Sequence, residues 1–300
     1  INSPENPDEK GHKLRLAFGN GLRPDVWAEM KSRFRIPEIL EFYGSTEGNV
    51  SLFNFDGKQG AIGRVPSFLK SQINIRLVEF DVETEQPIRG SDGLCRLARV
   101  GEVGEAIGLI GNDIRHDFSG YADKAASQKK ILTDVFKKGD RWFRTGDLMR
   151  RDKEGYVYFV DRIGDTFRWK GENVATNDVS DAVSKYPGVQ LANAYGVEVP
   201  GADGRAGMVA MTIDDSFRIE GLADHLKASL PSYAVPLFLR IQPEAETTGT
   251  MKLLKLALVK EGFDIEKVTD PIWFLEPGKR DYVAFGKAQM DRIHGGEYRL

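Results

Sequence analysis

The feature of the sequence that most constrains the fold is an apolar strand that runs directly into a loop of small residues. Residues 36–42 have the composition of a β-strand, and Tyr43-Gly44-Ser45-Thr46-Glu47-Gly48 follows without a break. Glycines let a backbone approach a ligand, and exposed N–H groups and hydroxyls bind anionic oxygens. The pattern predicts an α/β fold with a phosphate-binding loop at a strand end. An ordinary turn with a solvated Glu47 has the same pattern.

The residues before this loop have the order strand, turn, helix. Residues 14–18 alternate as in a half-buried strand, and Gly19-Asn20-Gly21 interrupts them. Pro24 is typical of a helix start, and Val26, Met30 and Phe34 follow at helical spacing.

The middle of the chain predicts short strands. Residues 61–110 are rich in β-forming residues and punctuated by glycine, with one strand expected at 73–78. A helix is expected at 121–137 and a further strand at 155–160.

The pattern changes to α+β near residue 164. A helix capped by Thr176 or Asn177 carries Val179 and Val183 four residues apart. Strands are expected within 189–199, 207–213 and 237–241, and a helix at 219–230 that ends at a proline. We therefore expect two domains: 1–163, part of a larger α/β domain with a β-rich subdomain, and 164–300, a small α+β lobe.

The composition excludes several classes of protein. The 300 residues include 42 Lys and Arg against 45 Asp and Glu, so the net charge of −3 predicts no strong attraction to nucleic acid or anionic lipid. The lone Cys95 forms no disulfide within one chain and is expected to be a buried small residue. No segment approaches the about 18 apolar residues of a membrane-spanning helix. Because the first residue is Ile1, we expect the N-terminal targeting region to be absent.

Further motifs follow the loop in a fixed order. They are Arg144-Thr145-Gly146-Asp147-Leu148, Asp161-Arg162-Ile163-Gly164-Asp165, Lys170-Gly171-Glu172-Asn173-Val174 and Thr248-Gly249-Thr250-Met251-Lys252. Together they resemble the adenylate-forming superfamily of acyl-CoA synthetases, luciferases and peptide-synthetase adenylation domains. The segments 19–25, 41–49 and 161–176 resemble its fatty-acid-transport-protein and very-long-chain acyl-CoA synthetase branch. The resemblance covers nearly the whole chain but only the C-terminal half of such a protein, without its Ser/Thr/Gly-rich phosphate loop.

The resemblance implies a ligase that joins a long-chain or very-long-chain fatty acid to CoA through an acyl-adenylate. Its substrates and cofactors would be the fatty acid, ATP, CoA and Mg²⁺, with no nucleic acid. The protein would be cytoplasmic or membrane-associated, with any peripheral membrane contact made through the absent half. The 300-residue chain alone is expected to be inactive.

The resemblance also implies a nucleotide site. Gly19, Asn20 and Gly21 would line the adenine pocket, and Tyr43 would stack on the base. Gly44 would approach the substrate carbonyl. Without the family, these glycines are expected to be simple turn formers.

Four further residues would contact the rest of ATP. Thr46 would contact phosphate and Glu47 would bind Mg²⁺. Asp147 would accept hydrogen bonds from both ribose hydroxyls, and Arg162 would bind ribose or phosphate. Without the resemblance, Asp147 is expected to cap a turn and Arg162 is expected to be a salt-bridged surface residue.

The C-terminal lobe would deliver the catalytic lysine. Lys252 would orient the carboxylate and stabilise the adenylation transition state, with Lys255 as the alternative. Two residues separate Lys252 from Gly249, a departure from many superfamily members that the transport-protein branch shares. Gly164, at the superfamily hinge position, would let the lobe rotate to present either Lys252 or the segment 167–172, the latter for thioester formation.

Three other functions fit parts of the sequence. The first is a ligase for another acid, such as a carnitine-type or aryl acid. The second is a fatty-acid uptake or carrier protein with no catalytic role. The third is a generic nucleotide-binding module, which would predict neither the lysine nor the hinge.

Overall fold

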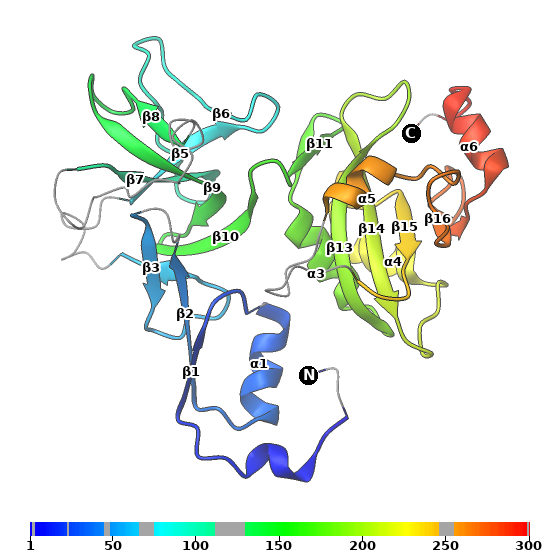
Figure 1. Cartoon of the computed structure of the whole chain (residues 1–300), viewed down its shortest axis with the longest axis horizontal. Helices are drawn as coiled ribbons and strands as arrows, with labels where there is room; N and C mark the ends of the chain where they lie inside the picture. The colour runs from blue at the N-terminus through cyan, green and yellow to red at the C-terminus, as the bar shows by residue number, and fades with distance from the viewer. Residues whose placement is uncertain are drawn as a thin grey trace. The chain divides into compact units, whose positions relative to one another are not determined.

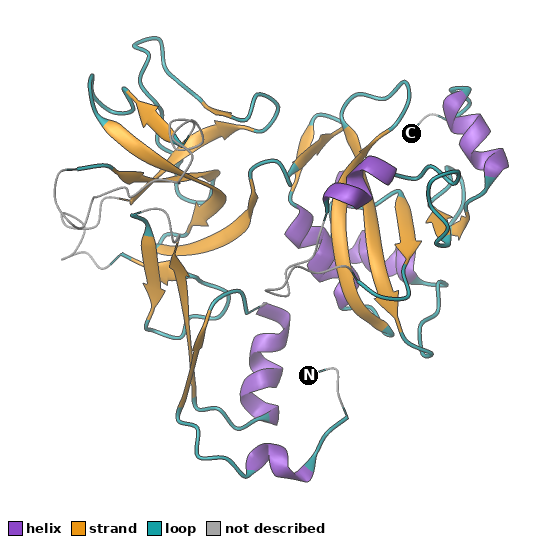
Figure 2. Ribbon diagram, viewed as in Figure 1, coloured by secondary structure: helices purple, strands orange, loops and turns teal. Residues whose placement is uncertain are grey.

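The computed structural model describes residues 1, 4–22, 24–44, 49–65, 75–111, 130–245, 255–298 and 300. The chain divides into two compact units, Ile1–Ile163 and Gly164–Leu300. Each unit combines sheets with a few helices (Figures 1 and 2), which confirms the mixed α/β class. The assignment of the units to part of a nucleotide-binding domain and a mobile lobe stays a prediction.

The first unit begins with a three-stranded sheet. Its strands are β1 (Leu16–Gly19), β2 (Glu38–Gly44) and β3 (Ser51–Asn54), and β2 is central. Strands β1 and β2 are parallel and are connected through α1 (Pro24–Arg33), so the predicted strand, turn and helix are confirmed. A 3₁₀ helix, η1 (Pro7–Lys10), precedes them. The buried Trp27 of α1 packs with Ile36 and Ile39 and covers one face of the sheet.

The opposite face of this sheet carries apolar side chains that are partly or largely exposed. Phe18 and Phe42 stack with ring centroids 4.8 Å apart, and Phe53 stands opposite Phe42 in the strand register. Phe18 and Phe53 are 55% and 41% exposed. Parallel strands are normally covered on both faces, so this surface is unusual.

A second sheet forms the rest of the first unit. Its order is β4, β10, β9, β7, β5, β6, with β8 also paired to β9. The strands are β4 (Gly63–Arg64), β5 (Ile75–Asp81), β6 (Gln86–Pro87), β7 (Val103–Leu109), β8 (Ile131–Thr133), β9 (Arg141–Arg151) and β10 (Tyr156–Arg162). One apolar cluster includes Leu52 of β3 and Met149 of β9. A separate cluster contains Cys95, Ile107 and Trp142, which confirms that the cysteine is buried.

The expected helix at 121–137 is wrong at its C-terminal end. Residues 131–133 form β8 and pair with β9. The chain then turns, because the carboxylate of Asp140 accepts hydrogen bonds from the amides of Val135 and Phe136 at 2.6 and 3.0 Å. Residues 121–129 lie outside the described residues.

The second unit contains a five-stranded sheet with the order β13, β14, β15, β16, β17. The strands are β13 (Val189–Glu198), β14 (Arg205–Ile213), β15 (Phe238–Ile241), β16 (Ile272–Phe274) and β17 (Val283–Ala284). Seven consecutive residues of β14 are buried, which is typical of a central strand covered on both faces. Strands β16 and β17 were not predicted from the sequence.

Four α-helices in the described part of the second unit contribute to its core. They are α3 (Thr176–Ser184), α4 (Leu222–Ser229), α5 (Leu256–Glu261) and α6 (Lys287–His294). A 3₁₀ helix, η3 (Ser232–Ala234), follows α4. A hairpin of β11 (Phe167–Trp169) and β12 (Glu172–Val174) precedes α3. No helix in the described ranges has the length and apolar content needed to cross a bilayer.

Two predicted helix starts need correction. Ala175 is the N-cap of α3, so neither Thr176 nor Asn177 caps it; the Thr176 hydroxyl accepts a hydrogen bond from Lys255 instead. Helix α4 begins at Leu222 rather than residue 219, because Gly221 has a φ of +88°, which is not helical.

Candidate functional site

The candidate site begins where the parallel strands β1 and β2 end. Gly19, the last residue of β1, stands in register with Glu41 of β2. The Glu41 carboxylate accepts hydrogen bonds from the amides of Gly21 and Leu22, both at 3.0 Å. Glu41 is 3% exposed, and burial raises its pKa while the two amides oppose that rise. The turn after β1 is therefore held in place by a buried carboxylate for which the sequence predicted no role.

The three predicted adenine-site residues lie on this turn. Gly19 is half-buried, and Asn20 and Gly21 are exposed. A side chain added at Gly19 or Gly21 would meet nothing within 4 Å. Gly21 has a φ of +82°, which favours glycine whatever the surrounding space. The turn is open on its outer side, and its conformation requires glycine at residue 21.

Tyr43, Asp147 and Arg162 form one cluster at the same strand end. The Tyr43 hydroxyl donates a hydrogen bond to Oδ2 of Asp147. Arg162 Nε lies 3.5 Å from Oδ1 of the same carboxylate, and the two residues are direct partners across β9 and β10. The Asp147 side chain is 10% exposed and that of Arg162 is 62% exposed. The structure thus brings together three residues that are separated by up to 119 positions in the sequence.

The electrostatics of the cluster keep Tyr43 protonated. Burial raises the pKa of its hydroxyl well above the ordinary value, and the negative charge of Asp147 raises it further. The phenol therefore acts as a hydrogen-bond donor to the carboxylate. This hydrogen bond joins the end of β2 to β9.

A bulge in β9 presents Asp147. Glu105 of β7 pairs with Leu148 of β9, and Ile107 pairs with Arg144. Between these two pairs, β7 has one residue, Ala106, whereas β9 has three, residues 145–147. Gly146 has a φ of +79°, and the Thr145 hydroxyl donates to the Ala106 carbonyl at 2.8 Å. The amide of Ile163 donates to the Gly146 carbonyl at 2.9 Å. Bulges are common next to functional sites, and this one takes Asp147 out of register with β7 while it stays paired with Arg162 of β10.

A buried ion pair lies beside the bulge. Arg144 Nε donates to both oxygens of Glu105, at 2.9 and 3.0 Å, and Glu105 is completely buried. Burial raises the pKa of Glu105, and Arg144 opposes that rise. This pair was not predicted from the sequence, because no local pattern indicates that a glutamate in a strand will be buried.

Three predicted site residues, Thr46, Glu47 and Lys252, lie outside the described residues. Gly44 is described: it ends β2 and pairs with Ser51 of β3. Within the described ranges, no group of three or more His, Cys, Asp or Glu side chains could hold a metal ion.

In the second unit, the predicted hinge residue Gly164 lies in the turn between β10 and β11 and has a φ of +91°. The alternative lysine, Lys255, is paired with Asp165 and Thr176. The predicted thioester segment forms the β11–β12 hairpin, whose loop residues Lys170 and Gly171 both have positive φ. This is the two-residue turn that fits the twist of a hairpin.

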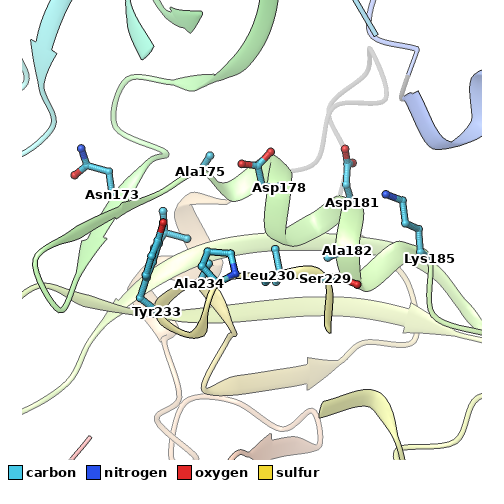
Figure 3. A pocket seen from close by; sticks show the side chains of 12 residues that line it. Asn173, Ala175, Asp178, Asp181, Ala182, Lys185, Ser229, Leu230, Tyr233 and Ala234 are labelled. Atoms are coloured by element: carbon cyan, nitrogen blue, oxygen red, sulfur yellow. The ribbon is translucent and has the colours of Figure 1, made fainter. Parts of the chain in front are cut away.

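A pocket of about 310 Å³ lies between α3 and the segment after α4 (Figure 3). Asp178 and Asp181 of α3 line it together with Tyr233 and Leu230. None of the predicted site residues lines this pocket.

The chain has clear relatives among curated proteins, although no protein-family profile matches it. It is 45% identical to long-chain fatty acid transport protein 6 of Mus musculus over 300 residues, which cover 99% of this chain and 48% of the relative. It is 45% identical to long-chain fatty acid transport protein 2 of Rattus norvegicus over 285 residues, 94% of this chain and 46% of the relative. The chain spans about half the length of the curated relatives it matches.

Solved structures share its fold. ATP-bound MatB from Rhodopseudomonas palustris superimposes with a TM-score of 0.65 and 22% identity, over 84% of this chain and 46% of that protein. The anthranilate CoA ligase AuaEII in complex with anthranoyl-AMP gives 0.64 and 20%, over 85% and 45%. Over about half of their length, this chain is therefore similar to the long-chain fatty acid transport proteins, and it shares the fold of MatB and of AuaEII.

Proposed function

We propose that the protein containing this chain is an ATP-dependent fatty acid–CoA ligase for long-chain or very-long-chain acids. The observation that carries the proposal is the Tyr43, Asp147 and Arg162 cluster beside the Gly19–Gly21 turn, in a chain 45% identical to a long-chain fatty acid transport protein. A buried carboxylate next to an aromatic ring at the end of parallel strands suits a nucleoside.

The reaction has two steps. In the first, a carboxylate oxygen attacks the α-phosphorus of ATP, and pyrophosphate leaves with the electrons of the broken P–O bond. In the second, the CoA thiol loses its proton and attacks the acyl carbonyl, and AMP leaves. Both steps place negative charge on oxygen, so fixed donors and cations accelerate them.

The described residues would hold the nucleotide. Asp147 would accept hydrogen bonds from the ribose hydroxyls in place of the Tyr43 hydroxyl, and the Tyr43 ring would stack on adenine. Arg162 is largely exposed and lies 3.5 Å from Asp147, so its guanidinium could reach ribose or phosphate. The open turn at Gly19, Asn20 and Gly21 would border the base, and Gly44 would approach the substrate carbonyl.

The remaining roles rest on the resemblance. Thr46 would contact phosphate, and Glu47 would bind Mg²⁺, which neutralises charge on phosphate oxygens. Lys252 would stabilise the adenylation transition state. The unit that starts at Gly164 would rotate to present Lys252 in one orientation and the β11–β12 hairpin in the other. Peripheral membrane contact would be made outside this chain.

The name of the relatives favours one competing function, a transport protein without catalysis. To separate the two, the complete protein would be assayed for acid-dependent exchange of pyrophosphate into ATP and then for CoA-dependent AMP release. A ligase gives both activities with long-chain acids, whereas a carrier binds the acids and gives neither. A panel that includes aryl acids and carnitine-type acids identifies a ligase for another acid.

The same assay tests the site. Asp147→Ala removes a charged acceptor, and such hydrogen bonds contribute about 1.5–3 kcal/mol, so KM for ATP should rise roughly tenfold to a hundredfold. Asp224→Ala is the matched control, since Asp224 forms an exposed pair with Arg280 in the second unit. An unchanged KM for ATP in Asp147→Ala would remove Asp147 from the nucleotide site.

A further inference from the structure

The ammonium group of Lys255 connects three segments of the second unit. Its Nζ lies 3.0 Å from Oδ2 of Asp165 and donates a hydrogen bond to the Thr176 hydroxyl at 2.8 Å. The side chains of Lys255 and Asp165 are only 22% and 34% exposed, and Thr176 is completely buried. Lys255 therefore differs from a solvated surface lysine, because it has two partners from segments 79 and 90 residues away.

Both partners of Lys255 lie next to or within elements that are packed in the second unit. Asp165 precedes the β11–β12 hairpin by two residues, and Phe167 and Trp169 of that hairpin are buried in the core of the second unit. The packing is tight, because a side chain added at Gly196 of β13 would come within 2.7 Å of Phe167. Thr176 is the first residue of α3.

Helix formation does not explain a lysine at residue 255. Lys255 is the N-cap of α5 and forms no side-chain capping bond. Favoured N-cap side chains accept a hydrogen bond from the first turn, whereas an ammonium group only donates. A cation at a helix N-terminus also opposes the helix dipole. The contacts with Asp165 and Thr176 are what this side chain provides.

We propose that Lys255 is a positioning residue for the predicted catalytic Lys252: the clamp of Lys255, Asp165 and Thr176 fixes the N-cap of α5, three residues after Lys252 in the sequence. The inference rests on the proposed function of Lys252. Lys252 lies outside the described residues and precedes Lys255 by three residues in the sequence. Asp165 follows Gly164 directly, so the clamp links the residue after the predicted hinge to the N-cap of α5.

The test compares the two half-reactions in the complete protein. Lys255→Met should slow acyl-adenylate formation by about tenfold to a hundredfold, because a small misplacement of a catalytic group has an effect of this size. KM for ATP, and thioester formation from preformed acyl-AMP, should stay unchanged. Asp165→Asn should reproduce the effect, and the double variant should be no slower than the slower single variant.

Three comparisons keep the outcome decisive. The matched control is Lys267→Met, which removes a lysine paired with Asp264 at 2.7 Å but 62% exposed, and it should change neither step. Thr176→Val removes one hydrogen bond and keeps the ion pair, so it should slow adenylation less than Lys255→Met. If Lys255→Met does not fold, Thr176→Val still tests the proposal. Exchanging the charges, Lys255→Asp with Asp165→Lys, should restore part of the rate.

Each contrary result has a separate meaning. If Lys252→Ala leaves adenylation intact, the proposed role of Lys252 fails. If Lys252→Ala slows adenylation but Lys255→Met does not, the clamp is rejected and the ligase proposal stands. Equal slowing of both steps with a lower Tm would reject positioning in favour of a purely structural ion pair. If Lys255→Met slows acyl-adenylate formation but Asp165→Asn does not, Lys255 would itself contact the reacting groups, and the positioning role would be rejected.

Discussion

Replacing Arg144 by methionine should destabilise the first unit strongly. Arg144 donates to both oxygens of Glu105 with its Nε, and a third contact places its guanidinium 2.9 Å from Oε2. Methionine fills much of the same space without the charge. The variant therefore leaves the Glu105 carboxylate completely buried and without its cation.

The expected loss is about 3–5 kcal/mol of unfolding free energy near neutral pH, the usual cost of removing one partner of a buried pair. The loss should depend on pH with a defined sign. Burial raises the pKa of Glu105 in the folded state, and Arg144 is the main cause that lowers it. In the variant this pKa rises further. Between pH 4.5, the ordinary pKa of the carboxyl group, and the raised folded-state pKa, Glu105 is protonated in the folded state and ionised in the unfolded state.

The destabilisation relative to the wild type should therefore grow once pH exceeds the folded-state pKa of Glu105 in the wild type, which is itself raised above 4.5, by up to about 1.4 kcal/mol per pH unit, until the higher folded-state pKa of the variant is passed. Below pH 4.5 the residue is protonated in both states and the variant should approach the wild type. Glu105→Gln combined with Arg144→Met should recover most of the stability, since no charge stays buried.

The measurement is hydrogen exchange of amides in β7 and β9 at pH 5 and pH 8, which reports on the first unit alone. Arg280→Met is the control, because Arg280 is 86% exposed in its pair with Asp224 and its removal should have no measurable effect. A variant whose loss is the same at both pH values would show that packing around Arg144, rather than the buried charge, holds this part of the sheet.

The other predictions concern the nucleotide turn, the lysine and the chain alone. Gly21→Ala should destabilise the turn by about 1–2 kcal/mol because of its positive φ, whereas Gly19→Ala should leave Tm unchanged and raise KM for ATP; equal Tm losses would contradict this reading. Lys252→Ala in the complete protein should slow adenylation far more than thioester formation from preformed acyl-AMP, and equal slowing would refute the assigned role. The 300-residue chain alone should release no AMP from ATP and a fatty acid, which a coupled AMP assay checks.

Local patterns were sufficient for much of the fold. The strand, turn and helix leading to Tyr43 are confirmed, as are β10, β13, β14 and β15. These elements have either strong periodicity or clear glycine and proline boundaries. The end of the predicted helix at 121–137 is wrong, because residues 131–133 pair with β9 and Asp140 closes a turn.

The arrangement of the site was predictable only in part. The resemblance implied roles for Tyr43, Asp147 and Arg162. No sequence pattern indicates that the Asp147 carboxylate contacts both Tyr43 and Arg162, because these contacts depend on strand register. Glu41, Glu105 and Arg144 were not assigned any role. Their burial results from how strands distant in sequence stack, and local composition contains no signal for it.

The exposed aromatic face of the first sheet has a consequence for ligand assays. Phe18, Phe42 and Phe53 offer an apolar surface on which a fatty acid or a hydrophobic dye can adsorb without entering any acyl pocket. Saturation of the isolated chain by palmitate would therefore measure adhesion to these rings. A titration on Phe18→Ser beside the unaltered chain separates such adhesion from recognition of a substrate.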